Sequence, residues 1–152
     1  FNLKIVYHAR KNMSVDYTYY GNLTKMAQIC DVLICITPGG AATHNLVNEE
    51  VLNALGPKGT LINVSRGSVV DEQALIAALA EGRLGWAGLD VFAAEPKVPA
   101  ALRALSNVVL LPHVGSATEE TRAAMGDLTV DNLLQHLKDG TVISPVPECA
   151  RL

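Results

Sequence analysis

The sequence contains few cysteines and few aromatic residues. Cys30, Cys35 and Cys149 are scattered over 152 residues, and aromatic side chains make up 5% of the chain. Small secreted domains that depend on disulfides carry more cysteines at closer spacing. We therefore expect buried structural thiols in a reducing, cytoplasmic compartment, and a core of closely packed aliphatic side chains.

Long apolar runs and an excess of positive charge are also absent. No uninterrupted apolar stretch approaches the roughly 20 residues that a transmembrane helix needs, and no signal-peptide pattern is visible. The formal net charge is −3, which leaves no basic footprint for nucleic acid or for an anionic membrane. We therefore expect neither nucleic acid nor a membrane as a partner.

The chain also lacks an initial methionine and a glycine-rich turn. It begins at Phe1 and enters a strand-like run, Leu3–Tyr7, almost at once. We interpret this start as that of a protein whose front portion is missing. The G-x-G-x-x-G turn that opens a dinucleotide-binding fold is not in the sequence, and we expect its strand and helix to precede Phe1.

The remaining pattern is an alternation of apolar runs and helical periodicity. Unbroken apolar runs are typical of parallel strands that helices cover on both faces, and strand–helix alternation predicts an α/β fold with a doubly wound sheet. The sheet would be incomplete, because its first strand is missing. The predicted strands are Leu3–Tyr7, Asp31–Ile36, Thr60–Val64, Trp86–Phe92 and Val108–Leu111, and the predicted helices are Leu23–Ile29, Asn48 to Leu55, Asp71 to Gly82 and Thr118 to Gly140.

Ligands of such sheets bind beyond the carboxyl ends of the strands. The first predicted strand ends at Tyr7 and is followed by Arg10 and Lys11, with no acidic residue between them. A guanidinium fork fits the dianion of a 2′-phosphate, so this turn favours NADP. The alternative is a solvated basic turn.

The next strand ends in Thr37 and Pro38, which two glycines follow. Small residues and a proline of fixed geometry allow the backbone to approach a flat or anionic ligand closely. The same composition is also typical of an ordinary turn.

The strand that ends at Val64 delivers Ser65 and Arg66 to its carboxyl end, and Gly67 lets the chain turn away. Arginine offers planar, two-point recognition of a carboxylate. The alternative for a lone arginine is a surface salt bridge.

Three more polar residues follow the last two strands. Asp90 lies among apolar residues, where it would face the carboxamide of a nicotinamide or satisfy backbone donors. Glu95 comes soon after it, and His113 follows the final strand among small residues. A lone histidine is more often structural. Because neighbouring parallel strands end at one edge, however, Arg66, Glu95 and His113 can converge on a single crevice.

These side chains would support reduction of a 2-oxo acid. His113 as imidazolium would protonate the developing alkoxide, and Glu95 on the opposite ring nitrogen would favour the charged ring. Arg66 would hold the substrate carboxylate, while a nicotinamide cofactor supplies hydride. A metal site of Glu95, His113 and Cys35 is the alternative; we expect no metal, because Cys35 lies inside an apolar strand.

Three ordered motifs resemble those of the D-isomer-specific 2-hydroxyacid dehydrogenase family, over nearly the whole chain. The resemblance implies that Arg66 binds substrate and that Glu95 and His113 handle the proton. It implies that Thr37, Pro38, Val64, Ser65, Arg66, Asp90, His113 and Gly115 contact the cofactor. The motifs are Asn63-Val64-Ser65-Arg66-Gly67, Gly88-Leu89-Asp90-Val91-Phe92 with Glu95-Pro96, and Pro112-His113-Val114-Gly115-Ser116-Ala117-Thr118.

Two features narrow the resemblance. Glu95 differs from the glutamine of the formate-oxidising branch, and Arg10-Lys11 is similar to NADPH-linked glyoxylate and hydroxypyruvate reductases. We expect a homodimer that reduces such 2-oxo acids to 2-hydroxy acids, with NADP preferred and NAD possible. The alternatives are an NAD-linked phosphoglycerate or lactate enzyme, and a corepressor-like dinucleotide-binding module without turnover.

The same resemblance suggests a division of the chain. Residues 1–117 would form a partial NAD(P)-binding Rossmann domain, and residues 118–152 a helix and tail that return to a substrate domain outside the sequence. The Pro-rich tail, Thr141 to Leu152, would dock on that domain. We expect this fragment to be inactive by itself.

Overall fold

The structure is a computed structural model that describes residues 2–146. The chain divides into two compact units, Phe1–His113 and Val114–Leu152. The first unit contains every strand and all helices except the last one, and the second contains that last helix.

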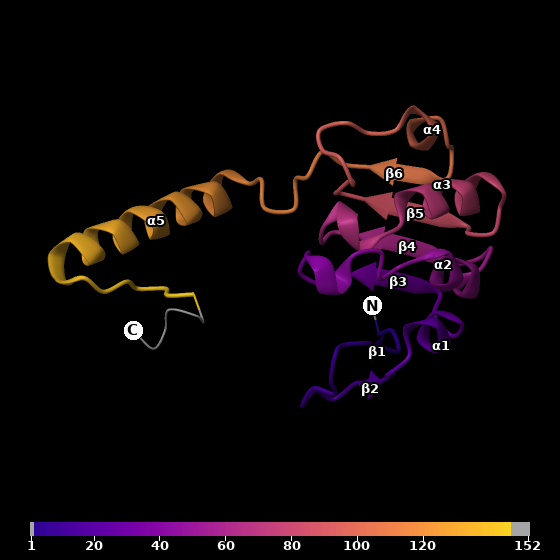
Figure 1. Ribbon diagram of the computed structural model, residues 1–152, viewed down its shortest axis with the longest axis horizontal. Helices are drawn as coiled ribbons and strands as arrows, with labels where there is room; N and C mark the ends of the chain where they lie inside the picture. Colours follow the sequence, from indigo (N-terminus) through magenta and orange to yellow (C-terminus); the bar gives the residue numbers. More distant parts are fainter. Residues whose placement is uncertain (1, 147–152) are drawn as a thin grey trace. The chain divides into compact units, whose positions relative to one another are not determined.

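A four-stranded parallel sheet forms the centre of the first unit (Figure 1). Cys35 lies opposite Asn63, Asn63 opposite Leu89, and Leu89 opposite Leu110, so the carboxyl ends of all strands are aligned at one edge. This alignment confirms the α/β fold and brings the segments that carry Arg66, Glu95 and His113 to one edge of the sheet. The strands, in spatial order, are β3 (Val32–Cys35), β4 (Thr60–Asn63), β5 (Trp86–Leu89) and β6 (Val108–Leu110).

The strand β5 ends earlier than the sequence pattern predicts. It stops at Leu89 rather than at Phe92. The backbone amide of Asp90 still bonds to the carbonyl of Asn63 at 3.0 Å, but the amide of Phe92 donates to the side chain of Glu95. The chain leaves the ladder because a carboxylate, and not a neighbouring strand, accepts that hydrogen bond.

Two short strands form a separate parallel pair. β1 (Val6–Tyr7) pairs with β2 (Thr18–Tyr19), and among the described residues neither strand pairs with β3. The prediction of one sheet that includes Leu3–Tyr7 was therefore wrong, and β2 was missed. A two-residue strand among polar neighbours leaves no periodicity to detect.

The two longest helices of the first unit begin at polar caps. The side chains of Asn48 and Asp71 accept hydrogen bonds from the amides of Val51 and Ala74, at 3.1 and 3.0 Å, which confirms both predicted caps. Short helical turns of three or four residues were not predicted, since they complete too little of a helical period. The helices are α1 (Leu23–Ala27), α2 (Glu49–Leu55), α3 (Glu72–Ala80) and α4 (Ala100–Arg103), with 3₁₀ turns η1 (Ala41–Thr43) and η2 (Gly67–Val69).

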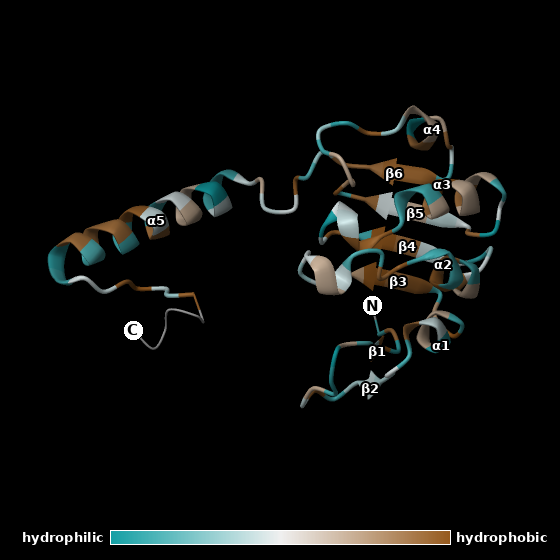
Figure 2. Ribbon diagram, in the orientation of Figure 1, coloured by the Kyte–Doolittle hydropathy of each residue, from teal (hydrophilic) through white to brown (hydrophobic). Residues whose placement is uncertain are grey.

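Within the described part of the first unit, helices cover one face of the sheet and leave the other face exposed. Leu61 and Leu89 point into a core that they share with Leu52 of α2 and Leu75 of α3. The opposite positions, such as Trp86, are exposed, although most of the strands are strongly hydrophobic (Figure 2). The sequence pattern predicts helices on both faces; within the described part of the first unit α2 and α3 pack together on one side. The exposed apolar positions form what we call the bare face: Val32, Ile34, Val64, Trp86, Val109 and Leu111.

The second unit consists of helix α5 (Glu119–Asp139) and the segment after it. Thr118 caps its start by accepting from the amide of Thr121 at 3.2 Å, and Gly140 ends it in a left-handed conformation, φ 77°, as the sequence predicts. In the part of the chain that the structure describes, no helix has the length and apolar character needed to cross a membrane. Cys149 and the end of the Pro-rich tail lie outside the described residues.

Candidate active site

Arg66 is presented by a turn that a buried amide closes. The side-chain oxygen of Asn63 accepts hydrogen bonds from the backbone amide and the hydroxyl of Ser65, at 3.1 and 2.9 Å. Its amide nitrogen donates to the carbonyl oxygen of Arg66 at 3.0 Å. Asn63 and Ser65 are buried, so they hold the backbone and leave the Arg66 side chain exposed at the carboxyl edge of β4.

Glu95 and His113 form a hydrogen-bonded ion pair. Nδ1 of His113 donates to Oε2 of Glu95 at 2.8 Å, and the backbone amide of Phe92 donates to Oε1 at 2.9 Å. The hydrogen bond from His113, followed by that from Phe92 and the charges of His113 and Arg66, lowers the pKa of the Glu95 carboxyl. Glu95 therefore stays negatively charged down to a lower pH than an ordinary glutamate does.

The backbone of His113 adopts a conformation that few side chains tolerate. Its φ is 56°, in the left-handed region where a non-glycine residue is uncommon. Such conformations cost of the order of 1 kcal/mol or more, and they gather at functional sites. Here the conformation turns the imidazole toward Glu95.

The three predicted catalytic side chains border one hollow, which we call the active-site cleft. Its volume is about 620 Å³. A Cβ atom added to Gly39 would lie 2.9 Å from Cγ of Arg66, so this glycine lets the loop after β3 approach the arginine closely. The structure thus brings Arg66, Glu95 and His113 together; their roles remain predictions. The cleft is lined by Gly39, Gly40, Arg66, Gly67, Ser68, Phe92, Ala93, Glu95 and His113.

Thr37 and Pro38 follow β3, from which Ile36 separates them. The Thr37 hydroxyl is buried and has no hydrogen-bond partner among the described residues, while the carbonyl of Pro38 accepts from the hydroxyl of Thr43 at 2.7 Å. A buried polar atom without a partner is uncommon and suits a site that a polar ligand completes.

Val64 and Asp90 line a cavity that is distinct from the active-site cleft. They line a cavity of about 480 Å³ on the bare face, together with residues such as Trp86 and Leu111. Asp90 is buried and Val64 is half exposed. The predicted cofactor residues are therefore divided between the active-site cleft and the bare face, and Gly115 belongs to the second unit.

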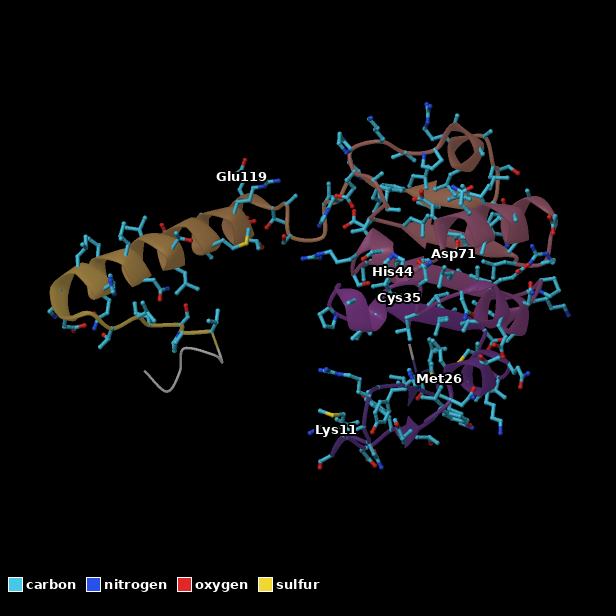
Figure 3. All side chains as sticks on the ribbon, viewed as in Figure 1. Lys11, Met26, Cys35, His44, Asp71 and Glu119 are labelled. Atoms are coloured by element: carbon cyan, nitrogen blue, oxygen red, sulfur yellow. The ribbon has the colours of Figure 1, made fainter. Side chains whose placement is uncertain are left out.

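Arg10 and Lys11 are exposed on residues 8–13, which we call the basic turn. The hydroxyl of Tyr7 accepts from the amide of Met13 at 2.8 Å, and the hydroxyl of Tyr19 donates to the carbonyl of Ala9 at 3.1 Å. Figure 3 shows Lys11 toward the same side of the first unit as Cys35, the last residue of β3.

The cysteine thiols of the first unit have low reactivity. Burial raises the pKa of Cys35 to about 12, and burial followed by the charge of Asp31 raises that of Cys30. A thiol that stays protonated is a poor metal ligand. No group of three or more histidine, cysteine or acidic residues in residues 2–146 is arranged to hold a metal ion.

Sequence reasoning missed several residues that shape the cleft. Asn63 was treated only as part of a motif, although a polar side chain inside an apolar strand is a signal that it bonds to the backbone. The close contact of Gly67 with Phe92 and the reach of Glu72 from α3 left no signal, because each joins residues more than 20 positions apart.

Comparison with known proteins identifies relatives of the whole chain. Residues 1–115 match the family described as D-isomer specific 2-hydroxyacid dehydrogenase, NAD binding domain. The chain is 51% identical to hydroxyphenylpyruvate reductase from Plectranthus scutellarioides and 50% identical to glyoxylate/hydroxypyruvate reductase A from Arabidopsis thaliana. Each match covers 96% of this chain and 47% of the relative, so the chain spans about half the length of these relatives.

A solved structure is also similar to this chain. This is the NADPH-dependent glyoxylate/hydroxypyruvate reductase from Sinorhizobium meliloti, determined in complex with NADP and malonate. The sequence identity is 52% and the TM-score is 0.94, over 97% of this chain and 46% of the other.

Proposed function

Because the chain belongs to the D-isomer specific 2-hydroxyacid dehydrogenase family, we propose that the whole protein reduces small 2-oxo acids to 2-hydroxy acids with NADPH. Glyoxylate and hydroxypyruvate are the proposed substrates. The names of relatives at 50–52% identity support this choice.

The observation that carries the proposal is the convergence of Arg66, Glu95 and His113 on one cleft. They come from segments that follow three different strands, and Glu95 bonds to His113 at 2.8 Å. A cation, an acid–base group and a carboxylate that orients it are the parts that carbonyl reduction requires.

Each of these side chains has a distinct task. Arg66 binds the carboxylate of the 2-oxo acid and polarises its carbonyl group. His113 is held by Glu95 through Nδ1, so Nε2 is the atom that gives a proton to the carbonyl oxygen. The pKa of Glu95 is lowered, chiefly by the hydrogen bond from His113, so Glu95 stays ionised and holds the imidazole ring in place.

Several features fit a nicotinamide dinucleotide. When bound, NADPH supplies the hydride. Thr37 offers a buried hydroxyl that has no partner within residues 2–146, and Pro38 lies beside it. Val64, Ser65, Asp90 and Gly115 are the other residues that we propose on the nicotinamide side. The exposed cations Arg10 and Lys11 match the dianionic 2′-phosphate.

Steady-state kinetics of the full-length protein test the proposal. Glyoxylate and hydroxypyruvate are assayed with NADPH and with NADH in parallel, by the loss of reduced-nicotinamide absorbance. We expect turnover of both acids and a higher kcat/KM with NADPH. Turnover with equal or better use of NADH would favour the NAD-linked alternative. No turnover on any small 2-oxo acid would favour a corepressor-like binding module.

We also propose a homodimer in the cytoplasm. The membership of the family supports the dimer, because the resemblance described above implies one. The free thiols Cys30 and Cys35 suit a reducing compartment. Sedimentation equilibrium of the full-length protein gives the oligomeric state; a monomer at micromolar concentration would contradict the dimer.

A further inference from the structure

Glu72, the first residue of α3, reaches the loop that follows β5. Its Oε2 atom accepts a hydrogen bond from the backbone amide of Ala93 at 3.1 Å. Ala93 lines the active-site cleft, whereas Glu72 does not. A carboxylate from outside the cleft therefore holds part of its wall.

The same peptide also packs against Gly67. A Cβ atom added to Gly67 would lie 1.9 Å from the carbonyl carbon of Phe92, 2.0 Å from its oxygen and 2.4 Å from the nitrogen of Ala93. The peptide between Phe92 and Ala93 thus lies against the backbone of Gly67, and its N–H is directed to Glu72.

The backbone amide of Phe92 links this peptide to the pair formed by Glu95 and His113. The N–H of Phe92 donates to Oε1 of Glu95 at 2.9 Å, and Oε2 of Glu95 accepts from His113 at 2.8 Å. Gly67, against which this peptide packs, directly follows Arg66 in the sequence. The Phe92–Ala93 peptide therefore connects Glu72 to all three candidate catalytic residues.

We propose that Glu72 is a positioning residue, which holds the Phe92–Ala93 peptide so that Glu95 stays against His113. Its role in catalysis rests on the proposed function, because Glu72 itself touches neither substrate nor cofactor in this arrangement. Without its hydrogen bond the peptide loses one of the contacts that hold it beside the cleft, and Glu95 departs from His113 more often.

The pKa of Glu95 is a measure of how closely Glu95 is held against His113. The groups that lower the pKa of Glu95 are His113, the amide of Phe92 and the charge of Arg66. If the loop loosens, the first two interactions weaken and the pKa rises toward its ordinary value of 4.5. A role of Glu72 confined to the stability of α3 would leave this titration unchanged.

Four variants separate the hydrogen bond from the charge and from the helix. Glu72→Ala removes both the acceptor and the charge, and Glu72→Gln keeps an acceptor without the charge. Glu72→Asp keeps a charge at the start of α3 on a shorter arm, so the helix remains favourable while the contact is lost. Gln73→Ala is the matched control, because Gln73 is the exposed neighbour in the same turn.

The first measurement is the carboxyl titration of Glu95 in each full-length variant, followed by carbon-detected NMR. We expect a raised pKa of Glu95 in Glu72→Ala and Glu72→Asp, and the wild-type titration in Glu72→Gln and Gln73→Ala. Equal shifts in the alanine and glutamine variants would show that charge alone acts, and would overturn the proposal. An unchanged titration in Glu72→Ala would also overturn it.

The second measurement is glyoxylate reduction. For Glu72→Ala we expect kcat to fall about fivefold, the equivalent of one hydrogen bond, with the KM for NADPH unchanged. An unchanged kcat would overturn the catalytic consequence. Because the NMR titration needs no turnover, a protein without reductase activity but with the expected titrations would contradict the proposed function and keep the structural role of Glu72.

Discussion

The active-site cleft and the basic turn both carry cations, but they are held in different ways. The backbone of Arg66 is fixed by the buried amide of Asn63, and Glu95 is fixed by Phe92 and His113. Arg10 and Lys11 stand on an exposed turn whose backbone bonds to Tyr7 and Tyr19. In the cleft, short-range hydrogen bonds fix each turn, and the bond between Glu95 and His113 joins the segments that follow β5 and β6; in the basic turn, hydrogen bonds hold the backbone while the two cations are exposed.

This difference separates two kinds of function. A group that transfers a proton must be held within tenths of an ångström of its partner, so it needs support from several elements. A group that attracts a phosphate dianion acts over a longer range and tolerates movement. Substitutions in the cleft should therefore have larger and more specific effects than substitutions in the basic turn.

The largest expected effect is that of His113→Gln. Removal of the proton donor should lower kcat for glyoxylate about a thousandfold, within the usual range for a general acid. The affinity for NADPH, measured by fluorescence titration, should stay nearly the same because the hydride donor makes its main contacts elsewhere. A retained rate would refute proton donation by His113.

Gly67→Ala should displace the Phe92–Ala93 peptide, which packs against Gly67 and borders the active-site cleft. The added Cβ would lie 1.9 Å from the carbonyl carbon of Phe92, so backbone must move. We expect a loss of about 3 kcal/mol in the free energy of unfolding, measured in urea, together with loss of turnover. Gly126→Ala is the control: in the described part of the chain nothing lies within 4 Å of its added Cβ, and alanine favours the helix that contains it. Equal stability of Gly67→Ala and wild type would contradict the close packing.

The double change Arg10→Ala with Lys11→Ala tests the basic turn. We expect KM for NADPH to rise about thirtyfold, which corresponds to about 2 kcal/mol of charge-assisted contacts, and KM for NADH to change little. The matched control is Lys25→Ala with Lys58→Ala, which removes two exposed charges elsewhere. Equal losses of NADPH and NADH affinity would show that the turn does not recognise the phosphate.

The smallest expected effect is a dependence of stability on pH. The pKa of Glu95 is lower in the folded protein than its ordinary value of 4.5. Its stabilising contribution should therefore be complete above that ordinary value and disappear as the pH falls through the lowered one. The free energy of unfolding of Glu95→Gln should lie below that of wild type at neutral pH, and the gap should close in acid. A gap that persists at low pH would exclude the ionised pair as its source.

The sequence by itself determined the elements whose signals are local. Apolar runs located β3, β4 and β6 to within two residues, and polar residues before helical patterns located the caps Asn48, Asp71 and Thr118. The family was also determined by sequence, because three motifs occur in order, and the matched family and the fold confirm it.

Only the tertiary structure decided which residues meet. The bond between His113 and Glu95, the peptide that rests on Gly67 and the contact of Glu72 with Ala93 depend on how the strands are aligned. The same holds for the bare face, which the apolar pattern predicted to be covered. The physical reason is that periodicity reports the environment of a residue along its own element, whereas contacts between distant segments arise from register and packing.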